Sequence, residues 1–135
     1  SLRVGWGYSP KNIINELYKI KPPFNVNKLA QVYATESLKD KNFVNRSVKH
    51  NQYWSRKFKN FFDKKNIISN ETSANFFLLN FDFCKLSANY VLKKLEKKGI
   101  ILRSMESYKM KNKLRVTIGS SKENNKFIKN LDHIL

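Results

Sequence analysis

The chain has 135 residues and a formal net charge of +17, with 27 Lys and Arg residues against 10 Asp and Glu residues. This length fits one domain or part of a larger protein, and it is enough to bury a core. No apolar run is long enough to span a membrane, and a single cysteine, Cys84, excludes an internal disulfide and a cysteine-based metal cluster. A reducing, cytoplasmic setting is therefore expected.

A strong positive charge is often a sign of a nucleic-acid or membrane partner. Here the lysines are spread over every expected helix, and they accompany many Asn, Ile, Phe and Tyr residues, which AT-rich codons also encode. We interpret the charge as a solvated surface set by composition and expect no specific nucleic-acid partner. A basic nucleic-acid-binding module stays the alternative from another functional class.

The first 64 residues predict one strand and three helices. Residues 2–8 have the apolar pattern of a strand, and Ser9 followed by Pro10 is typical of a helix start. Asn27 is expected to cap a second helix, which runs through Leu38. A long helix without Gly or Pro follows, from about Lys41 to Lys64.

From residue 67 the pattern favours a compact two-layer α/β unit with the element order β-α-β-β-α and helices on one face of the sheet. Gly99 has the position of a residue that ends a helix in the left-handed conformation, and Ser120 and Glu123 have the spacing of a capping box. The expected elements are strand 74–81, helix 86–98, strand 100–103, loop 104–112, strand 114–118 and a last amphipathic helix up to Leu135.

Three of the five arginines follow or interrupt apolar residues of expected strands: Arg3, Arg103 and Arg115. A guanidinium held among apolar groups needs an anion, because an unpaired buried charge is costly. Arginine also offers a rigid fork of donors that matches a carboxylate or a phosphate. The three arginines therefore predict an anion-binding site. His50 and His133, by contrast, are expected at the surface, without a metal site.

Five motifs resemble, in order and approximate spacing, the C-terminal part of the histidinol-phosphate aminotransferases, which are fold type I enzymes that use pyridoxal 5′-phosphate. The string of two prolines followed by Phe-Asn-Val-Asn is fairly specific for this family. The motifs, which together span essentially the whole chain, are Leu2-Arg3-Val4-Gly5-Trp6-Gly7-Tyr8, Lys21-Pro22-Pro23-Phe24-Asn25-Val26-Asn27, Ser73-Ala74-Asn75-Phe76, Gly99-Ile100-Ile101-Leu102-Arg103 and Leu114-Arg115-Val116-Thr117-Ile118-Gly119.

The resemblance implies a role for each arginine. Arg3 matches the arginine that holds the phosphate of pyridoxal 5′-phosphate. Arg115 matches the arginine that binds the substrate carboxylate, or the corresponding anion of the amino donor. Arg103 matches a second substrate-anion arginine, associated with the phosphate of histidinol phosphate. Asn75 matches an asparagine beside the substrate arginine, although a strand-edge asparagine bonded to backbone is the alternative.

The resemblance further implies an enzyme that exchanges an amino group between histidinol phosphate and 2-oxoglutarate, with glutamate as the other amino acid of the pair, and that works as a homodimer. The lysine of the internal Schiff base would precede residue 1, so no catalytic residue is expected here and the chain alone should be inactive. Residues 1–40 would end the large domain, 41–64 would form a connecting helix and 65–135 the small domain. A related aminotransferase with another substrate stays an alternative.

Overall fold

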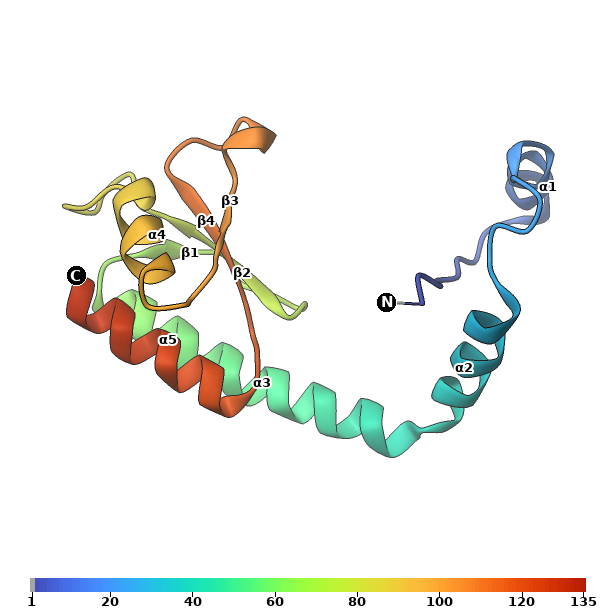
Figure 1. Cartoon of the computed structure of the whole chain (residues 1–135), viewed down its shortest axis with the longest axis horizontal. Helices are drawn as coiled ribbons and strands as arrows, with labels where there is room; N and C mark the ends of the chain where they lie inside the picture. Colours follow the sequence, from blue (N-terminus) through green and yellow to red (C-terminus); the bar gives the residue numbers. More distant parts are fainter. Residues whose placement is uncertain (1) are drawn as a thin grey trace. The chain divides into compact units, whose positions relative to one another are not determined.

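The computed structural model describes residues 2–135, which fall into two compact units that divide between Asn45 and Arg46 (Figure 1). The division lies within the first turns of the long helix α3, Lys41–Lys64. Each unit is described here by itself.

The first unit consists of two helices and the start of α3. Helix α1 spans Lys11–Ile20 and helix α2 spans Lys28–Lys39. The strand predicted for residues 2–8 is wrong, since these residues adopt no regular secondary structure. A strand requires a neighbouring strand for its hydrogen bonds, and residues 2–45 contain none.

The helix starts follow the sequence signals, with one shift. Asn27 caps α2 as predicted, because its Oδ1 accepts a hydrogen bond of 2.8 Å from the backbone N–H of Ala30. For α1, however, the residue at the N-cap position is Pro10 and not Ser9, and no side chain caps the helix. The helix therefore begins one residue later than the Ser-Pro pair predicts.

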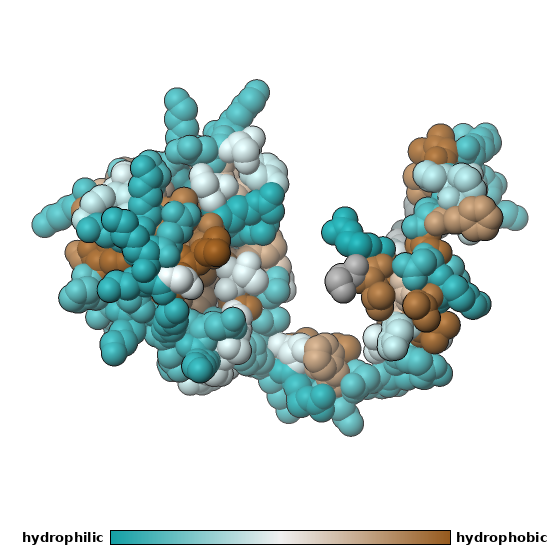
Figure 2. Space-filling model, viewed as in Figure 1, coloured by the Kyte–Doolittle hydropathy of each residue, from teal (hydrophilic) through white to brown (hydrophobic). Residues whose placement is uncertain are grey.

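The first unit exposes many of its large apolar side chains, and Ala30 is its only buried apolar residue among those described (Figure 2). Trp6, Tyr8 and Phe24 are almost fully exposed. Isolated exposed apolar residues are normal, but a whole segment of them is typical of a surface that another part of a protein covers.

The second unit is a two-layer α/β structure with a four-stranded antiparallel sheet in the order β1-β2-β4-β3. Helices α3, α4 and α5 cover one face of the sheet (Figure 1). This confirms the predicted architecture, although strand β1 was missed. The elements are β1 (Ile68–Ser69), β2 (Phe76–Asn80), α4 (Ala88–Glu96), β3 (Arg103–Ser104), β4 (Lys113–Thr117) and α5 (Ser121–Ile134), with a short 3-10 helix at Glu106–Tyr108.

Aromatic side chains of α3 form the centre of the core. Phe58 and Phe62 are fully buried, and their ring centres lie 6.1 Å and 5.6 Å from the ring centre of Phe77 on β2. Phe127 of α5 completes the cluster, 5.4 Å from Phe58. Trp54, at one end of this cluster, is also buried. Edge-to-face ring pairs of this kind add to the stability that burial itself provides.

Two left-handed residues end the helices that precede strands. Gly99 has φ +67°, and the N–H of Ile100 donates to the carbonyl of Leu95, which is the Schellman arrangement that the glycine predicts. Asn66 plays the same part after α3, with φ +54° and a hydrogen bond from Ile67 N–H to a carbonyl of that helix. Only glycine and a few short polar residues adopt this conformation readily.

The strand predicted at 100–103 is shorter and later than expected, because β3 contains only Arg103 and Ser104. The Schellman turn uses Ile100, and pairing with β4 begins only where Arg103 lies opposite Arg115. Residues 100–102 are therefore an extended approach to the sheet and not part of it.

Helix α5 begins with the predicted capping box. The Oγ of Ser120 accepts from the backbone N–H of Glu123, and a carboxylate oxygen of Glu123 accepts from the backbone N–H of Ser120 at 2.8 Å. The Ser120 hydroxyl also donates to this carboxylate oxygen at 2.6 Å. This bond and, after it, the one from the Ser120 backbone lower the pKa of Glu123. Throughout residues 2–135, none of the helices has both the length and the apolar character of a membrane span.

Replacing Phe58 with alanine should lower the free energy of unfolding of the second unit by about 3–5 kcal/mol, because the substitution leaves a cavity among four aromatic rings. Urea unfolding followed by far-UV circular dichroism measures this change. Phe83→Ala is the matched control, since Phe83 is 79% exposed and should shift the midpoint little. Equal shifts for the two variants would contradict the central place of Phe58.

Candidate functional site

The face of the sheet that the helices leave open carries two of the predicted arginines side by side. Alternation along β4 buries Leu114 and Val116 in the core and turns Arg115 to the other face. Arg103 of β3 lies directly opposite Arg115 in the strand register, and Leu78 of β2 lies opposite it on the other side. Two like charges at opposed positions repel each other, so an anion bound between them would stabilise this face.

Each guanidinium lies over an aromatic ring. The guanidinium carbon of Arg115 is 5.3 Å from the ring centre of Phe76, and that of Arg103 is 5.4 Å from the ring centre of Tyr108. Arg103 also donates a hydrogen bond of 2.9 Å from Nη2 to the Tyr108 hydroxyl. Such stacking fixes the plane of the guanidinium while its edge remains available to a ligand.

The burial of the arginines differs from the prediction. Arg3 and Arg103 are exposed, and only Arg115 is partly buried. The reason is that Arg3 lies in no strand and β3 forms the edge of the sheet. The argument from a buried charge holds for Arg115 alone: its Nε is buried, and no acceptor among residues 2–135 bonds to it. A buried donor without an acceptor costs about 1–3 kcal/mol.

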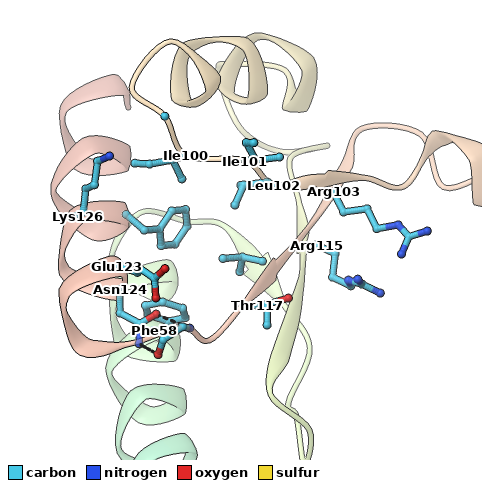
Figure 3. A pocket seen from close by; sticks show the side chains of 14 residues that line it. Phe58, Ile100, Ile101, Leu102, Arg103, Arg115, Thr117, Glu123, Asn124 and Lys126 are labelled. Atoms are coloured by element: carbon cyan, nitrogen blue, oxygen red, sulfur yellow. Dashed lines mark hydrogen bonds between the residues drawn. The ribbon is translucent and has the colours of Figure 1, made fainter. Parts of the chain in front are cut away.

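An open pocket of about 670 Å³ lies between residues 99–103, strand β4 and helix α5 (Figure 3). Its interior is mainly apolar, with Leu102 and Phe127 among its walls. Arg103 and Arg115 belong to its rim, but in Figure 3 their side chains point together away from Glu123 and the rest of α5. We therefore place the anion site on the open face of the sheet and not inside this pocket.

The end of β4 is held by polar contacts that converge on Gly119. The side chain of Asn124, which is only 2% exposed, accepts from the Gly119 N–H through Oδ1 and donates to the Gly119 carbonyl through Nδ2, both at 2.9 Å (Figure 3). His50 of α3 is 2.8 Å from the same carbonyl through Nε2, which must therefore carry the proton. His50, which was expected at the surface, is half-buried and makes this contact.

Glycine leaves room at this junction for the side chain of Glu123. A Cβ atom at position 119 would lie 2.8 Å from a carboxylate oxygen of Glu123, the group that completes the capping box. The bonds of His50 and Asn124 with Gly119 connect helices α3 and α5 to the strand that carries Arg115. Sequence reasoning missed this junction, because Asn124 and His50 have no motif in common and meet Gly119 only in the folded chain.

Arg3 lies in the first unit, with φ +55° and an exposed side chain. None of the hydrogen bonds or ion pairs described for residues 2–135 involves its guanidinium, and neither Gly5 nor Gly7 has any atom within 4 Å of where a Cβ would be. The Arg3 guanidinium is exposed and makes none of these bonds, and the nearby Gly5 and Gly7 leave free space around the backbone. These properties fit a phosphate group, which binds arginine in bidentate fashion.

Asn75 precedes β2 and is exposed. Its backbone carbonyl accepts from the N–H of Ile118 at 2.8 Å. By strand alternation Asn75 belongs to the same face as Phe77 and not to the face of Leu78 and Arg115. Among residues 2–135 no hydrogen bond joins its side chain to either arginine. The substrate contact that the resemblance implies for Asn75 stays a prediction.

Two further ionisable side chains, Cys84 and Asp82, have shifted pKa values. Burial raises the pKa of the Cys84 thiol, which keeps it protonated and a poor nucleophile. Lys113 donates to Asp82 at 3.2 Å and is the main reason that the pKa of Asp82 is lowered. In the part of the chain that the structure describes, no group of three His, Cys, Asp or Glu side chains is arranged to hold a metal ion.

The family model for aminotransferases of class I and II matches residues 1–131. The chain therefore belongs to this family. A histidinol-phosphate aminotransferase from Clostridium acetobutylicum has the same fold, with a TM-score of 0.80 over 92% of the chain at 24% sequence identity. This confirms the predicted fold class, which is that of a portion of a fold type I aminotransferase.

Two curated relatives carry a more specific name. The chain is 60% identical over 129 residues to a histidinol-phosphate aminotransferase from Pelagibacter ubique, and 39% identical over 134 residues to one from Campylobacter jejuni. These matches cover 95% and 99% of the chain but only 36% of each relative. The chain thus spans about a third of the length of the relatives that it matches.

Asn124→Ala should lower the free energy of unfolding by about 1–3 kcal/mol, because it removes both hydrogen bonds that the buried Asn124 side chain makes with Gly119. The exposed neighbour on the same helix provides the control, Asn125→Ala, for which no comparable loss is expected. Thermal unfolding of the two variants compares them directly. If Asn125→Ala were the more destabilising of the two, the role given to Asn124 would be wrong.

Proposed function

We propose that this chain is the C-terminal portion of a pyridoxal-phosphate-dependent aminotransferase that exchanges the amino group between histidinol phosphate and 2-oxoglutarate. The names of the relatives from Pelagibacter ubique and Campylobacter jejuni, at 60% and 39% identity, support the reaction. The placement at the C-terminus rests on the order of the five motifs, from Arg3 to Arg115.

The observation that carries the proposal is the pairing of Arg103 and Arg115 across β3 and β4 on the open face of the sheet. In 2-oxoglutarate each arginine can bind one of the two carboxylates, whereas histidinol phosphate has a single anionic group, its phosphate, which can lie between the two arginines. Arg115, whose buried Nε has no acceptor within residues 2–135, takes the carboxylate common to amino acid and oxo acid.

Pyridoxal phosphate, when bound, supplies the electron sink that aminotransferase chemistry needs. Among the residues of this chain, Arg3 is the one whose character fits the phosphate of that cofactor. No lysine for a Schiff base is assigned within the chain, and for that reason we propose that residues 1–135 alone do not transaminate.

The exposed apolar side chains of the first unit fit the same proposal. Residues 1–40 would complete a large domain, residues 41–64 would connect, and residues 65–135 would form the small domain. The exposed apolar residues of helices such as α1, Ile13 and Leu17 among them, would then be covered by the rest of the large domain or by the second subunit of a homodimer. A cytoplasmic location, expected from the single Cys84, stays a prediction.

The coding sequence that precedes residue 1 tests the proposal without any protein. It should encode a lysine a short way before Arg3, in a context rich in serine and threonine, because the family places its Schiff-base lysine there. DNA sequencing of the region decides the matter. An initiator codon close to residue 1, with no such lysine, would refute the proposal of an enzyme and favour a binding module instead.

Arg115 is tested in a hybrid enzyme, in which residues 1–135 replace the matching 36% of the relative from Pelagibacter ubique. Arg115→Lys should raise the KM values of both histidinol phosphate and 2-oxoglutarate by about tenfold or more, because lysine cannot make the bidentate contact. Steady-state kinetics with each substrate varied in turn measures the change.

Arg56→Lys is the matched control in the same hybrid. Arg56 is exposed on α3, where its Nε donates to the carbonyl of Gln52 within the helix. The substitution should leave both KM values unchanged. If Arg115→Lys also left both unchanged, the role of Arg115 would be refuted, whereas an inactive unsubstituted hybrid would count against the proposed reaction as a whole.

A further inference from the structure

Tyr108 makes two contacts with Arg103 that distinguish this arginine from Arg115. Its hydroxyl accepts a hydrogen bond of 2.9 Å from Nη2 of Arg103, and its ring centre is 5.4 Å from the guanidinium carbon. Arg115 instead lies over Phe76, whose ring has no hydroxyl. The two halves of the anion site therefore differ by one phenolic O–H group.

The backbone of the loop between β3 and β4 holds Tyr108 in place. The carbonyl of Met105 accepts from the N–H groups of both Tyr108 and Met110, at 3.0 Å and 3.2 Å. Lys109 takes the left-handed conformation, with φ +59°, and its N–H donates to the carbonyl of Glu106 at 2.9 Å. This hydrogen-bonded turn fixes the backbone of Tyr108 and places its phenol next to Arg103.

The far end of the same loop is also fixed. Asn112 is left-handed, with φ +54°, and its Oδ1 accepts from the N–H of Ala88 at the start of α4 at 2.7 Å. The N–H of Met105 donates to the carbonyl of Lys113 at 3.2 Å, which continues the pairing of β3 with β4 beyond Ser104. The loop thus has hydrogen bonds to the sheet and to a helix, and Tyr108 is its only aromatic residue.

Arg103 and Tyr108 still have hydrogen-bond donors that a ligand can use. A phenol oxygen that accepts from Arg103 still has its own O–H to donate, and a guanidinium has five N–H donors, of which this contact uses one. A phosphate monoester presents three terminal oxygens and a carboxylate two. The fork of Arg103 satisfies two oxygens, so a third acceptor is present only when the ligand is a phosphate.

We propose that Tyr108 is a specificity-determining residue of the Arg103 subsite, where it orients the guanidinium and donates its O–H to the third oxygen of a phosphate group. The inference rests on the proposed function and adds to it a donor for the third oxygen of the phosphate beside Arg103. A dicarboxylate substrate uses the same subsite through the arginine fork alone.

Tyr108→Phe in the hybrid enzyme tests this assignment, because it removes the hydroxyl and keeps the ring under the guanidinium. The value of kcat/KM for histidinol phosphate should fall about threefold to tenfold, which is the range of one typical hydrogen bond. The value for 2-oxoglutarate should change by less than about twofold, since a carboxylate does not need the third donor. Both values come from the same preparation, so a loss of folded enzyme would lower both alike.

Tyr90→Phe is the control, because Tyr90 on α4 is similarly exposed and its ring is 5.3 Å from Nζ of Lys94. It should change neither value. Equal effects of Tyr108→Phe on the two substrates, or none, in an active hybrid would overturn the inference and leave the proposed reaction intact. An inactive unsubstituted hybrid would instead count against the proposed reaction.

Discussion

The packing of the α3 aromatic rings on one face of the sheet is the constraint on which the rest of the second unit depends. Phe58 and Phe62 lie against Phe77 of β2, and this contact commits every second residue of the strand to the core. Since side chains alternate strictly, the register that buries Leu114 and Val116 on β4 also turns Arg115 to the open face. A slip of one residue would bury the guanidinium and expose the core, which makes the register costly to change.

Helix α3 also helps to position the site through a polar side chain, that of His50. His50 of α3 and Asn124 of α5 both bond to the carbonyl of Gly119, which directly follows the end of β4. Buried polar groups that satisfy one another fix a single arrangement, because any alternative leaves a donor or an acceptor without a partner. The helical layer thus holds the position of β4 along its axis as well as its orientation.

The two arginines of the open face are neighbours in register but differ in surroundings, and this difference matches the chemistry proposed for them. Arg115 is partly buried over a hydrocarbon ring, and the carboxylate of 2-oxoglutarate, or the phosphate of histidinol phosphate in the other half-reaction, would neutralise it. Arg103 is exposed at the sheet edge beside a phenol, where anions of different shape can be accepted in turn.

Much of this protein could be predicted from its sequence wherever a signal is local. The caps at Asn27 and Ser120, the left-handed Gly99 and the span of α3 depend on residues that lie within one or two turns of each other, and all were predicted. The motifs around Arg3, Arg103 and Arg115 likewise identified the family. The tertiary structure alone decided what depends on distant partners: residues 2–8 have strand-like composition but no neighbouring strand to pair with, and β3 begins only where Arg103 meets Arg115. His50, Asn124 and Tyr108 acquire their parts in the same way, because hydrogen bonds between elements far apart in the chain, or across a folded loop, exist only once the sheet and its helices have formed.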